Sequence, residues 1–371
     1  MRSLFSNATS IVAAVGLALA TRSLCAASPL PVGYTNASVV GNTASRGDLD
    51  NRLHVVIWYP AVAGTPTEPI AIGPPGVPYF EESDGALDAP IAATPSSLPF
   101  IVVSHGTGGT SMDLSWLCAG LAARGYIVAS VDHPGNNALE APTVAGNAVW
   151  WLRADDLSRV IDGVLAMPRF GARIDRARIG AAGFSLGGYT VLVLAGARSD
   201  DRLLGAYCAR KPTTPVCSGV ATPTMPDVGA RAAALAASDP TFRAAMAANL
   251  TTHRDARVKS VFSIAPALGP AIVPESLASI DVPVAVLAGA GDPIVPVLDN
   301  AIPDALGITN AELTLFPKAV GHYSFLTDCA AAGRAQFAAI CGDAGPTRTA
   351  LHRAATDLAA AFFDRTLDVE R

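Results

Sequence analysis

The sequence is poor in charge. Asp, Glu, Lys and Arg make up 15% of its 371 residues, against roughly 25% in ordinary soluble domains. It has no run of Lys or Arg, and its 26 basic and 31 acidic residues give a formal net charge of −5. Nucleic acid and anionic membrane surfaces are therefore not expected as partners. Because 50% of the residues are hydrophobic, the chain predicts a large buried core.

An apolar run near the N-terminus is too short to span a membrane, which takes about 20 residues. Residues 11–20 are apolar, follow Arg2 and lead into small residues around Cys25. This is the pattern of a secretory signal peptide. We expect residues 1–27 to be cleaved, the protein to be secreted or periplasmic, and no stable membrane insertion. A lipid anchor at Cys25 is the weaker alternative, because residues 22–24 lack the usual small-residue approach.

Cysteine is rare, and no Cys/His cluster has the spacing of zinc ligands. Apart from Cys25, four of the six cysteines form two close pairs. Cys208 and Cys217 are nine residues apart, and Cys329 and Cys341 are twelve apart. In an oxidising compartment these spacings predict two local disulfides. The remaining cysteine, at position 118, lies in an apolar pattern and is expected to be a buried thiol.

Short apolar runs alternate with amphipathic helical patterns along the chain. The expected strands are residues 53–59, 98–104, 126–131, 178–184, 258–265, 282–288 and 313–316. The expected helices include residues 111–124, 153–167 and 186–197. This alternation predicts an α/β fold whose mainly parallel sheet is covered by helices on both faces. The first run precedes a Pro/Gly-rich stretch and is expected to form an antiparallel lead-in.

Residues 199–256 interrupt this alternation. They have no strand pattern, but a Pro/Thr/Cys-rich loop and an Ala-rich helical stretch at 228–250. Excursions of this length in a compact domain are usually functional. We interpret the insertion as a helical cap over the site, within a single domain spanning residues 28–371. A decoration packed on the surface is the alternative.

One serine lies where a strand is expected to turn into a helix. Ser185 is the centre of Gly-Phe-Ser-Leu-Gly at 183–187, between two apolar runs. A sharp turn there strains the serine backbone and leaves no room for side chains two residues away on either side. The helix N-terminus offers N–H groups and partial positive charge to an oxyanion. In this context Gly-x-Ser-x-Gly predicts a nucleophile elbow; a tight turn with an incidental serine is the alternative.

A serine nucleophile needs a base and an acid that orients the base. Asp292 follows the strand expected at 282–288, and His322 follows the one at 313–316. The carboxyl ends of the strands are where open α/β sheets place their sites. We therefore predict a catalytic triad of Ser185, His322 and Asp292.

The rival acids and bases are less well placed in the sequence. Asp281 precedes its strand, and Asp299 lies well beyond the strand end. His54 falls within an expected strand, and His253 and His352 lie in polar helical surroundings.

The loop after the strand at 98–104 is rich in glycine and begins His-Gly-Thr-Gly-Gly at residue 105. Glycines allow the backbone to approach a substrate oxygen. We predict that the amides of Thr107 and Leu186 form the oxyanion hole.

Three further residues are candidates for substrate contact. His105 is expected to order its loop rather than to act as a base. His133 follows the next strand along the chain, where it either lines the pocket or braces the loop. Trp150 begins a helix, and it either packs in the core or forms a wall of an acyl pocket.

With these residues in hand, the chain resembles the α/β-hydrolase family. More narrowly, it is similar to secreted bacterial esterases related to dienelactone hydrolase and plasma-type platelet-activating-factor acetylhydrolase. The resemblance covers roughly residues 52–198 and 257–326 and rests on "VVIWYPA", "VVSHGTGG", "VDHPG", "RADDLSRVID" and "GFSLGGYT". It implies the α/β-hydrolase fold and a serine hydrolase activity.

Two features depart from these relatives. Dienelactone hydrolases use a cysteine nucleophile, whereas this chain has Ser185. Acetylhydrolase relatives take their acid from a loop that here reads "SIAPALGPA" and has no carboxylate. Asp292 is then the best candidate for the acid.

These features together predict a secreted serine hydrolase that cleaves neutral carboxylic esters with small or medium acyl groups. Its partner is a small-molecule ester, and the mechanism needs no metal or organic cofactor. The alternatives are a peptidase, a lipase or phospholipase, a polyester hydrolase, and a non-catalytic binding protein with the same fold.

Overall fold

The computed structural model describes residues 29–41, 51–93, 95–219, 225, 227–342 and 345–369. The predicted signal peptide, residues 1–27, lies outside the described residues and stays a prediction. The strands are β1 (Val32–Val40), β2 (Arg52–Pro60), β3 (Glu68–Ile72), β4 (Phe80–Leu87), β5 (Leu98–Ser104), β6 (Ile127–Val131), β7 (Ile174–Phe184), β8 (Val258–Ile264), β9 (Val284–Gly289) and β10 (Ala311–Phe316).

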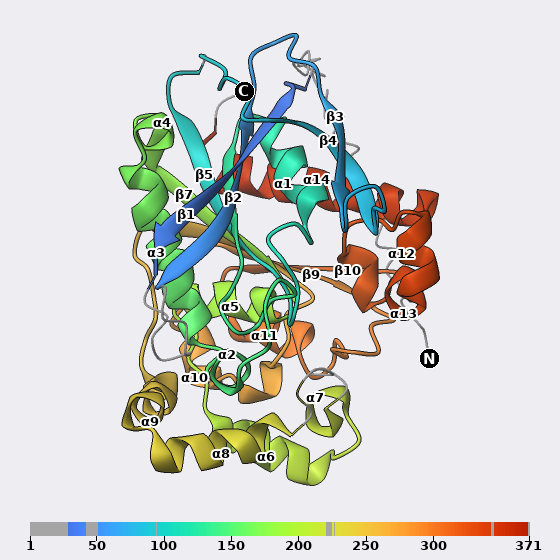
Figure 1. Ribbon diagram of the computed structural model, residues 1–371. Coiled ribbons are helices and arrows are strands. Elements are labelled where there is room, and N and C mark those ends of the chain that lie inside the picture. Colours follow the sequence, from blue (N-terminus) through green and yellow to red (C-terminus); the bar gives the residue numbers. More distant parts are fainter. Residues whose placement is uncertain are drawn as a thin grey trace, which may run out of the picture.

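These strands form one sheet in the order β10-β9-β8-β7-β5-β6-β2-β1-β4-β3 (Figure 1). The pairs from β6 through β5, β7, β8 and β9 to β10 are all parallel. β2 pairs antiparallel with both β6 and β1. The predicted mainly parallel sheet with an antiparallel lead-in is therefore confirmed.

Helices cover both faces of the sheet. They are α1 (Ser115–Ala122), α2 (Val144–Ala148), α3 (Leu152–Ala166), α4 (Pro168–Gly171), α5 (Leu186–Ala195), α6 (Asp201–Arg210), α7 (Pro215–Ser218), α8 (Val228–Ser238), α9 (Pro240–Ala247), α10 (Pro274–Leu277), α11 (Ala301–Gly307), α12 (Ala331–Gln336), α13 (Ala338–Cys341) and α14 (Pro346–Thr366). Short 3₁₀ turns are η2 (Ala248–Leu250), η3 (Gly269–Ala271) and η4 (His322–Phe325). No helix in the described part of the chain combines the length and apolarity needed to cross a membrane.

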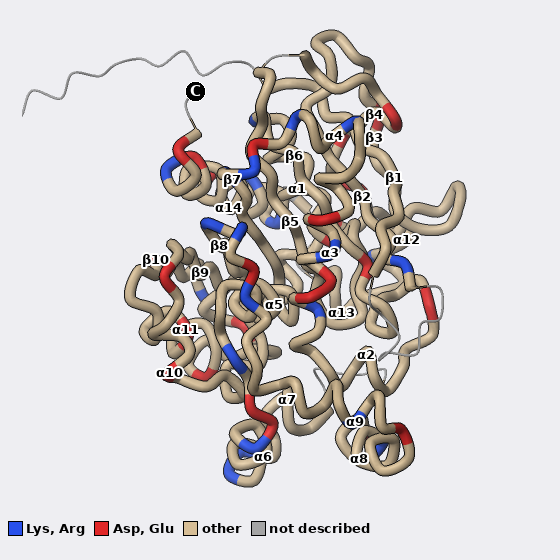
Figure 2. The backbone as a smooth tube through the Cα atoms, turned by 90° about the vertical axis from the view of Figure 1, so that its left-hand side faces the viewer, with Lys and Arg blue, Asp and Glu red and all other residues tan. Residues whose placement is uncertain are grey.

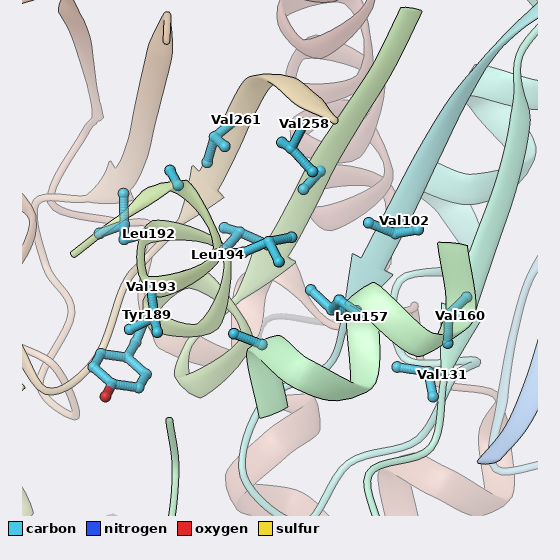
Figure 3. Close-up of a cluster of buried hydrophobic side chains, with 14 of the residues drawn as sticks. Val102, Val131, Leu157, Val160, Tyr189, Leu192, Val193, Leu194, Val258 and Val261 are labelled. Atoms are coloured by element: carbon cyan, nitrogen blue, oxygen red, sulfur yellow. The ribbon is translucent and has the colours of Figure 1, made fainter. Parts of the chain in front are cut away.

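The two faces of each central strand pack in different apolar layers, because side chains alternate along a strand. In β5, Phe100 and Val102 belong to the layer that contains α3 and α5, whereas Ile101 and Val103 belong to the layer with α1 and α14. Figure 3 shows Val102 in the first layer, beside Leu157 of α3. Burying each such side chain contributes about 1.5–3 kcal/mol, so the strands are fixed from both sides.

The insertion at 199–256 forms α6, α7, α8, α9 and η2. Its helices α6, α8 and α9 lie at one end of the molecule in both Figure 1 and Figure 2. The helical stretch predicted at 228–250 is broken at Asp239-Pro240, because proline begins α9 and Asp239 accepts hydrogen bonds from the first amides of that helix. A disulfide between Cys208 and Cys217 links α6 to α7.

A second disulfide joins Cys329 to Cys341, so the structure contains both expected pairs. It links the chain after η4 to α13. Cys118 is a buried free thiol on α1, as predicted. Burial raises the pKa of this thiol, so it stays protonated and packs as a small apolar side chain.

Candidate active site

Ser185 occupies the sharp turn between β7 and α5. Its backbone has φ +58° and ψ −120°, a conformation that side-chain-bearing residues rarely adopt. A Cβ atom on Gly183 would lie 2.2 Å from the Gly187 oxygen, and one on Gly187 would lie 2.0 Å from the Ser104 oxygen. The two glycines of the motif are therefore needed for close backbone approach, as the sequence predicts.

The three residues predicted to form a triad are joined by hydrogen bonds. The distance from Ser185 Oγ to His322 Nε2 is 2.9 Å, and that from His322 Nδ1 to Asp292 Oδ2 is 2.7 Å. A carboxylate can only accept hydrogen bonds, so the imidazole proton belongs on Nδ1 and leaves Nε2 to accept from the serine hydroxyl. The residues are 7%, 4% and 6% exposed in that order.

Surrounding groups fix the acid and the base. Asp292 Oδ1 accepts hydrogen bonds from the amides of Ile294 and Val295, at 2.8 and 2.9 Å. The Phe184 ring lies 4.7 Å from the His322 ring, centroid to centroid. Two backbone donors and one aromatic wall therefore hold the pair in place.

The rival acids and bases lie in ion pairs away from the serine. These pairs are Asp281 with Arg254, Asp299 with Lys211, His54 with Asp132, His253 with Asp155, and His352 with Glu82. A histidine–carboxylate pair is thus common in this chain, and hydrogen bonding to the elbow serine distinguishes His322.

The two residues predicted to supply the oxyanion donors belong to the same cavity wall as the serine. Thr107 and Leu186 both line this cavity. Within the part of the chain that the structure describes, neither amide donates a hydrogen bond. The amide after Thr107, that of Gly108, is instead taken by Asn136 Oδ1 at 3.1 Å. Two N–H groups beside a serine hydroxyl are what a developing oxyanion requires.

His105 and His133 lie beneath the cavity wall and do not line it, so the expectation of substrate contact is corrected for both. His105 Nδ1 donates to the Gly106 oxygen at 2.6 Å, and its Nε2 accepts from the His133 amide at 3.1 Å. His133 is 0% exposed and lies between Ser104 Oγ and Asp156. All four ring nitrogens are used by the protein itself.

Arg153 on α3 places a positive charge beside the loop after β5. The sequence analysis did not identify this residue. Arg153 is buried and donates to the His105 oxygen and to Asn136 Oδ1, the latter at 3.0 Å. Burial and the neighbouring guanidinium hold the pKa of His105 well below its ordinary value. The available signal was the spacing of Arg153 and Asp156, two charged residues on a helix face whose other buried residues are all apolar.

Trp150 lines the cavity and also packs against the apolar layer that contains α3 and α5. Its neighbour Trp151 points into the core, where its Nε1 donates to the Ala245 oxygen at 3.0 Å. This bond links α3 to α9 of the insertion.

The cavity beside Ser185 has a volume of about 1010 Å³. Its walls come from the elbow, the loops after β5, β6, β8 and β9, the chain around β3 and β4, the insertion, and the segment from His322 to α13. Asp113 and Asp227 are its only Asp or Glu residues, and no Lys or Arg lines it among the described residues. The described residues also contain no group of three or more His, Cys, Asp or Glu side chains that could hold a metal ion.

The sheet and the elbow define the chain as an α/β hydrolase. Its sequence matches the family described as serine aminopeptidase, S33, over residues 96–322, more than half of its length, and the chain belongs to this family. A solved structure with a similar fold is a ferulic acid esterase from Streptomyces cinnamoneus. The two are 22% identical, with a TM-score of 0.58, covering 93% of this chain and 92% of that one.

At this level of identity the esterase establishes the fold alone. None of the curated proteins compared with the chain matches it. The narrower resemblance to dienelactone hydrolase and platelet-activating-factor acetylhydrolase stays a prediction.

Proposed function

We propose that the protein is a serine hydrolase of carboxylic esters that acts through an acyl-enzyme. The observation that carries this proposal is the hydrogen-bonded chain from Ser185 through His322 to Asp292, at an elbow that opens on a cavity. The largely apolar, cation-free wall favours neutral substrates over anionic ones.

The geometry supports a two-step reaction. His322 Nε2 takes the proton of Ser185 Oγ as that oxygen attacks the ester carbonyl, and Asp292 stabilises the imidazolium. The amides of Thr107 and Leu186 hold the oxyanion. The alcohol leaves with the proton from His322. Water then attacks the acyl-enzyme with His322 as base, which releases the acid and restores Ser185.

We further propose that the insertion caps the cavity and that the protein works outside the cytoplasm. Helices α6, α7 and α8 contribute residues to the cavity wall, which supports the cap. Two disulfides are compatible with an oxidising compartment.

The test compares wild type with Ser185→Ala on a panel of nitrophenyl esters of increasing acyl length and on peptide amides. We expect the wild type to cleave esters of small or medium acids, to prefer esters to amides, and to be labelled at Ser185 by a fluorophosphonate. Ser185→Ala should lower kcat by about a thousandfold or more with the fold intact. Ser238→Ala, at an exposed serine on α8, is the matched control.

Residual activity within tenfold of wild type would refute the assignment of Ser185. A preference for peptide amides would favour the aminopeptidase activity in the family's description. A wild-type protein that neither turns over any ester nor takes the label would favour a non-catalytic binding protein.

A further inference from the structure

Asp113 is a carboxylate on the cavity wall that the proposed mechanism does not use. It ends the loop that begins after β5 and carries Thr107. The carboxylate accepts hydrogen bonds from Thr110, whose Oγ1 lies 2.9 Å from Asp113 Oδ1. No Lys, Arg or His among the described residues pairs with it, so the carboxylate is anchored but has no cationic partner.

Neighbouring residues leave space for the Asp113 carboxylate, but among the described residues none supplies a positive charge to it. A Cβ atom on Gly109 would lie 2.1 Å from Asp113 Oδ2, so the glycine leaves space for the carboxylate. The other carboxylate on the cavity wall, Asp227, is paired with Arg231 at 2.9 Å and is exposed. Burial raises the pKa of Asp113 to about 6. A group that enters this part of the cavity with a hydrogen-bond donor would gain a charge-assisted bond.

The nearby wall is aromatic. Tyr79, Phe80 and Phe337, which we call the aromatic wall, all line the cavity. The Phe337 ring lies 5.1 Å from that of Tyr79 and 6.0 Å from that of Phe80, centroid to centroid.

Two backbone hydrogen bonds connect the aromatic wall to Asp113. The Thr327 amide donates to the backbone carbonyl oxygen of Asp113 at 2.9 Å, and the Ala330 amide donates to the backbone carbonyl oxygen of Tyr79 at 2.9 Å. The segment after His322 therefore joins the backbone of Asp113 to the backbone of Tyr79, and both residues line the same cavity.

We propose that Asp113 recognises a hydroxyl group on an aromatic ring of the substrate, which packs against the aromatic wall. The preferred substrates are then hydroxylated aromatic esters, and this inference rests on the proposed ester hydrolase function. A neutral hydroxyl fits better than an ammonium group, because a cation would lose its hydration in a largely apolar cavity and gain one carboxylate that Thr110 already engages.

The test uses methyl phenylpropanoates that carry a hydroxyl at the ortho, meta or para position, each paired with its methoxy counterpart. The methoxy group keeps the ring and the oxygen but cannot donate a hydrogen bond. For at least one position, the wild type should prefer the hydroxyl ester by about tenfold or more in kcat/KM. Asp113→Leu should remove this preference, so that its kcat/KM values for the hydroxyl and methoxy esters differ by less than about twofold.

The matched control is Asp227→Asn, which changes the other carboxylate of the wall and should keep the preference. A wild type without preference at any of the three positions would overturn the inference but not the ester hydrolase function. So would an Asp113→Leu variant that keeps the preference, or a preference for an aminomethyl ester over the hydroxyl ester.

A direct binding measurement separates the two proposals. If no ester is turned over, the proposed function fails, and calorimetric binding of the same hydroxyl and methoxy esters to Ser185→Ala protein tests the inference independently. Tighter binding of a hydroxyl ester that Asp113→Leu abolishes would support it. Equal binding of each pair would overturn it.

Discussion

At the scale of single residues, the site depends on a strained backbone that its neighbours hold in place. A side-chain-bearing residue at positive φ costs roughly 1–3 kcal/mol. The Ser185 amide donates to the backbone carbonyl oxygen of Ile264 at 2.9 Å, and the backbone carbonyl oxygen of Ser185 accepts from the Ala267 amide at 3.1 Å. The end of β8 and the chain after it therefore fix both backbone groups of the serine and offset its strain.

Gly187→Ala should damage the site more than the fold. The new Cβ would lie 2.0 Å from the Ser104 oxygen and 2.7 Å from that of His105. Relief of this clash has to move the elbow away from the loop that carries the Thr107 amide. We expect kcat to fall by about a hundredfold, the loss typical of one oxyanion donor, and the free energy of unfolding to fall by about 2 kcal/mol.

The measurements are ester kinetics and urea unfolding. Gly205→Ala on α6 is the control, because nothing lies within 4 Å of its ideal Cβ position. It should stabilise the helix by up to about 1 kcal/mol and leave kcat unchanged. A Gly187→Ala enzyme with wild-type kcat would show that the elbow tolerates displacement.

At the scale of elements, the strands from β10 to β2 along the sheet are predictable from sequence, and β1, β4 and β3 at its other end are not. β5 begins and ends where predicted, because both of its faces are buried and it reads as one apolar run. β4 reads Phe-Glu-Glu-Ser-Asp-Gly-Ala-Leu, and only Gly85 in it is buried. Such a strand has no apolar period to detect, so β4 and its partner β3 were not predicted.

The site shows the same division. The order of serine, acid and histidine along the chain predicts the triad, because each follows a strand that ends at the same sheet edge. The hydrogen bonds from Arg153 to the loop after β5 and the place of Asp113 on the cavity wall depend on contacts between segments far apart in sequence. The spacing of Arg153 and Asp156 is visible in the sequence, but the partners of Arg153 are not, because they lie on other segments of the chain.

The loop after β5 should lose its shape without the guanidinium beneath it. Arg153→Met removes the donors to the His105 oxygen and to Asn136 Oδ1, the acceptor that also holds the Gly108 amide. We expect kcat for esters to fall by about tenfold or more while KM changes little, because the loop supplies an oxyanion donor rather than substrate affinity. Arg153→Lys should recover part of the loss.

Steady-state kinetics well below the unfolding temperature separate this effect from lost stability. Arg159→Met, on the exposed side of the same helix α3, should have wild-type kcat. A rise in KM at constant kcat would contradict a positioning role for Arg153.

At the scale of the whole molecule, the sheet separates two apolar layers, and most of the charged residues that the structure describes are not buried. Some ionisable groups are nonetheless buried in partnered form, such as His133 with Asp156. Asp304 on α11 differs: it is 1% exposed, and its Oδ2 has no hydrogen-bond partner among the described residues. Burial raises its pKa well above the ordinary value.

This carboxyl should make the folded protein less stable as pH rises. The folded state keeps a proton that the unfolded chain releases above a pKa of about 3.9. The stabilisation is therefore complete below that value and is lost as pH rises toward the folded-state pKa, at about 1.4 kcal/mol per pH unit. Asp304→Asn removes this titration, so its free energy of unfolding relative to wild type should increase as pH rises above the unfolded-state pKa, until the pH reaches the folded-state pKa of Asp304.

Urea unfolding at several pH values measures the difference between the two curves. The slope of that difference is the informative quantity, because an asparagine in the same place also leaves polar atoms buried and shifts the whole curve. Asp281→Asn, at an exposed aspartate paired with Arg254, should run parallel to wild type apart from a small constant offset. Parallel curves for Asp304→Asn and wild type would mean that Asp304 ionises normally in the folded protein, and that α11 accommodates a buried charge.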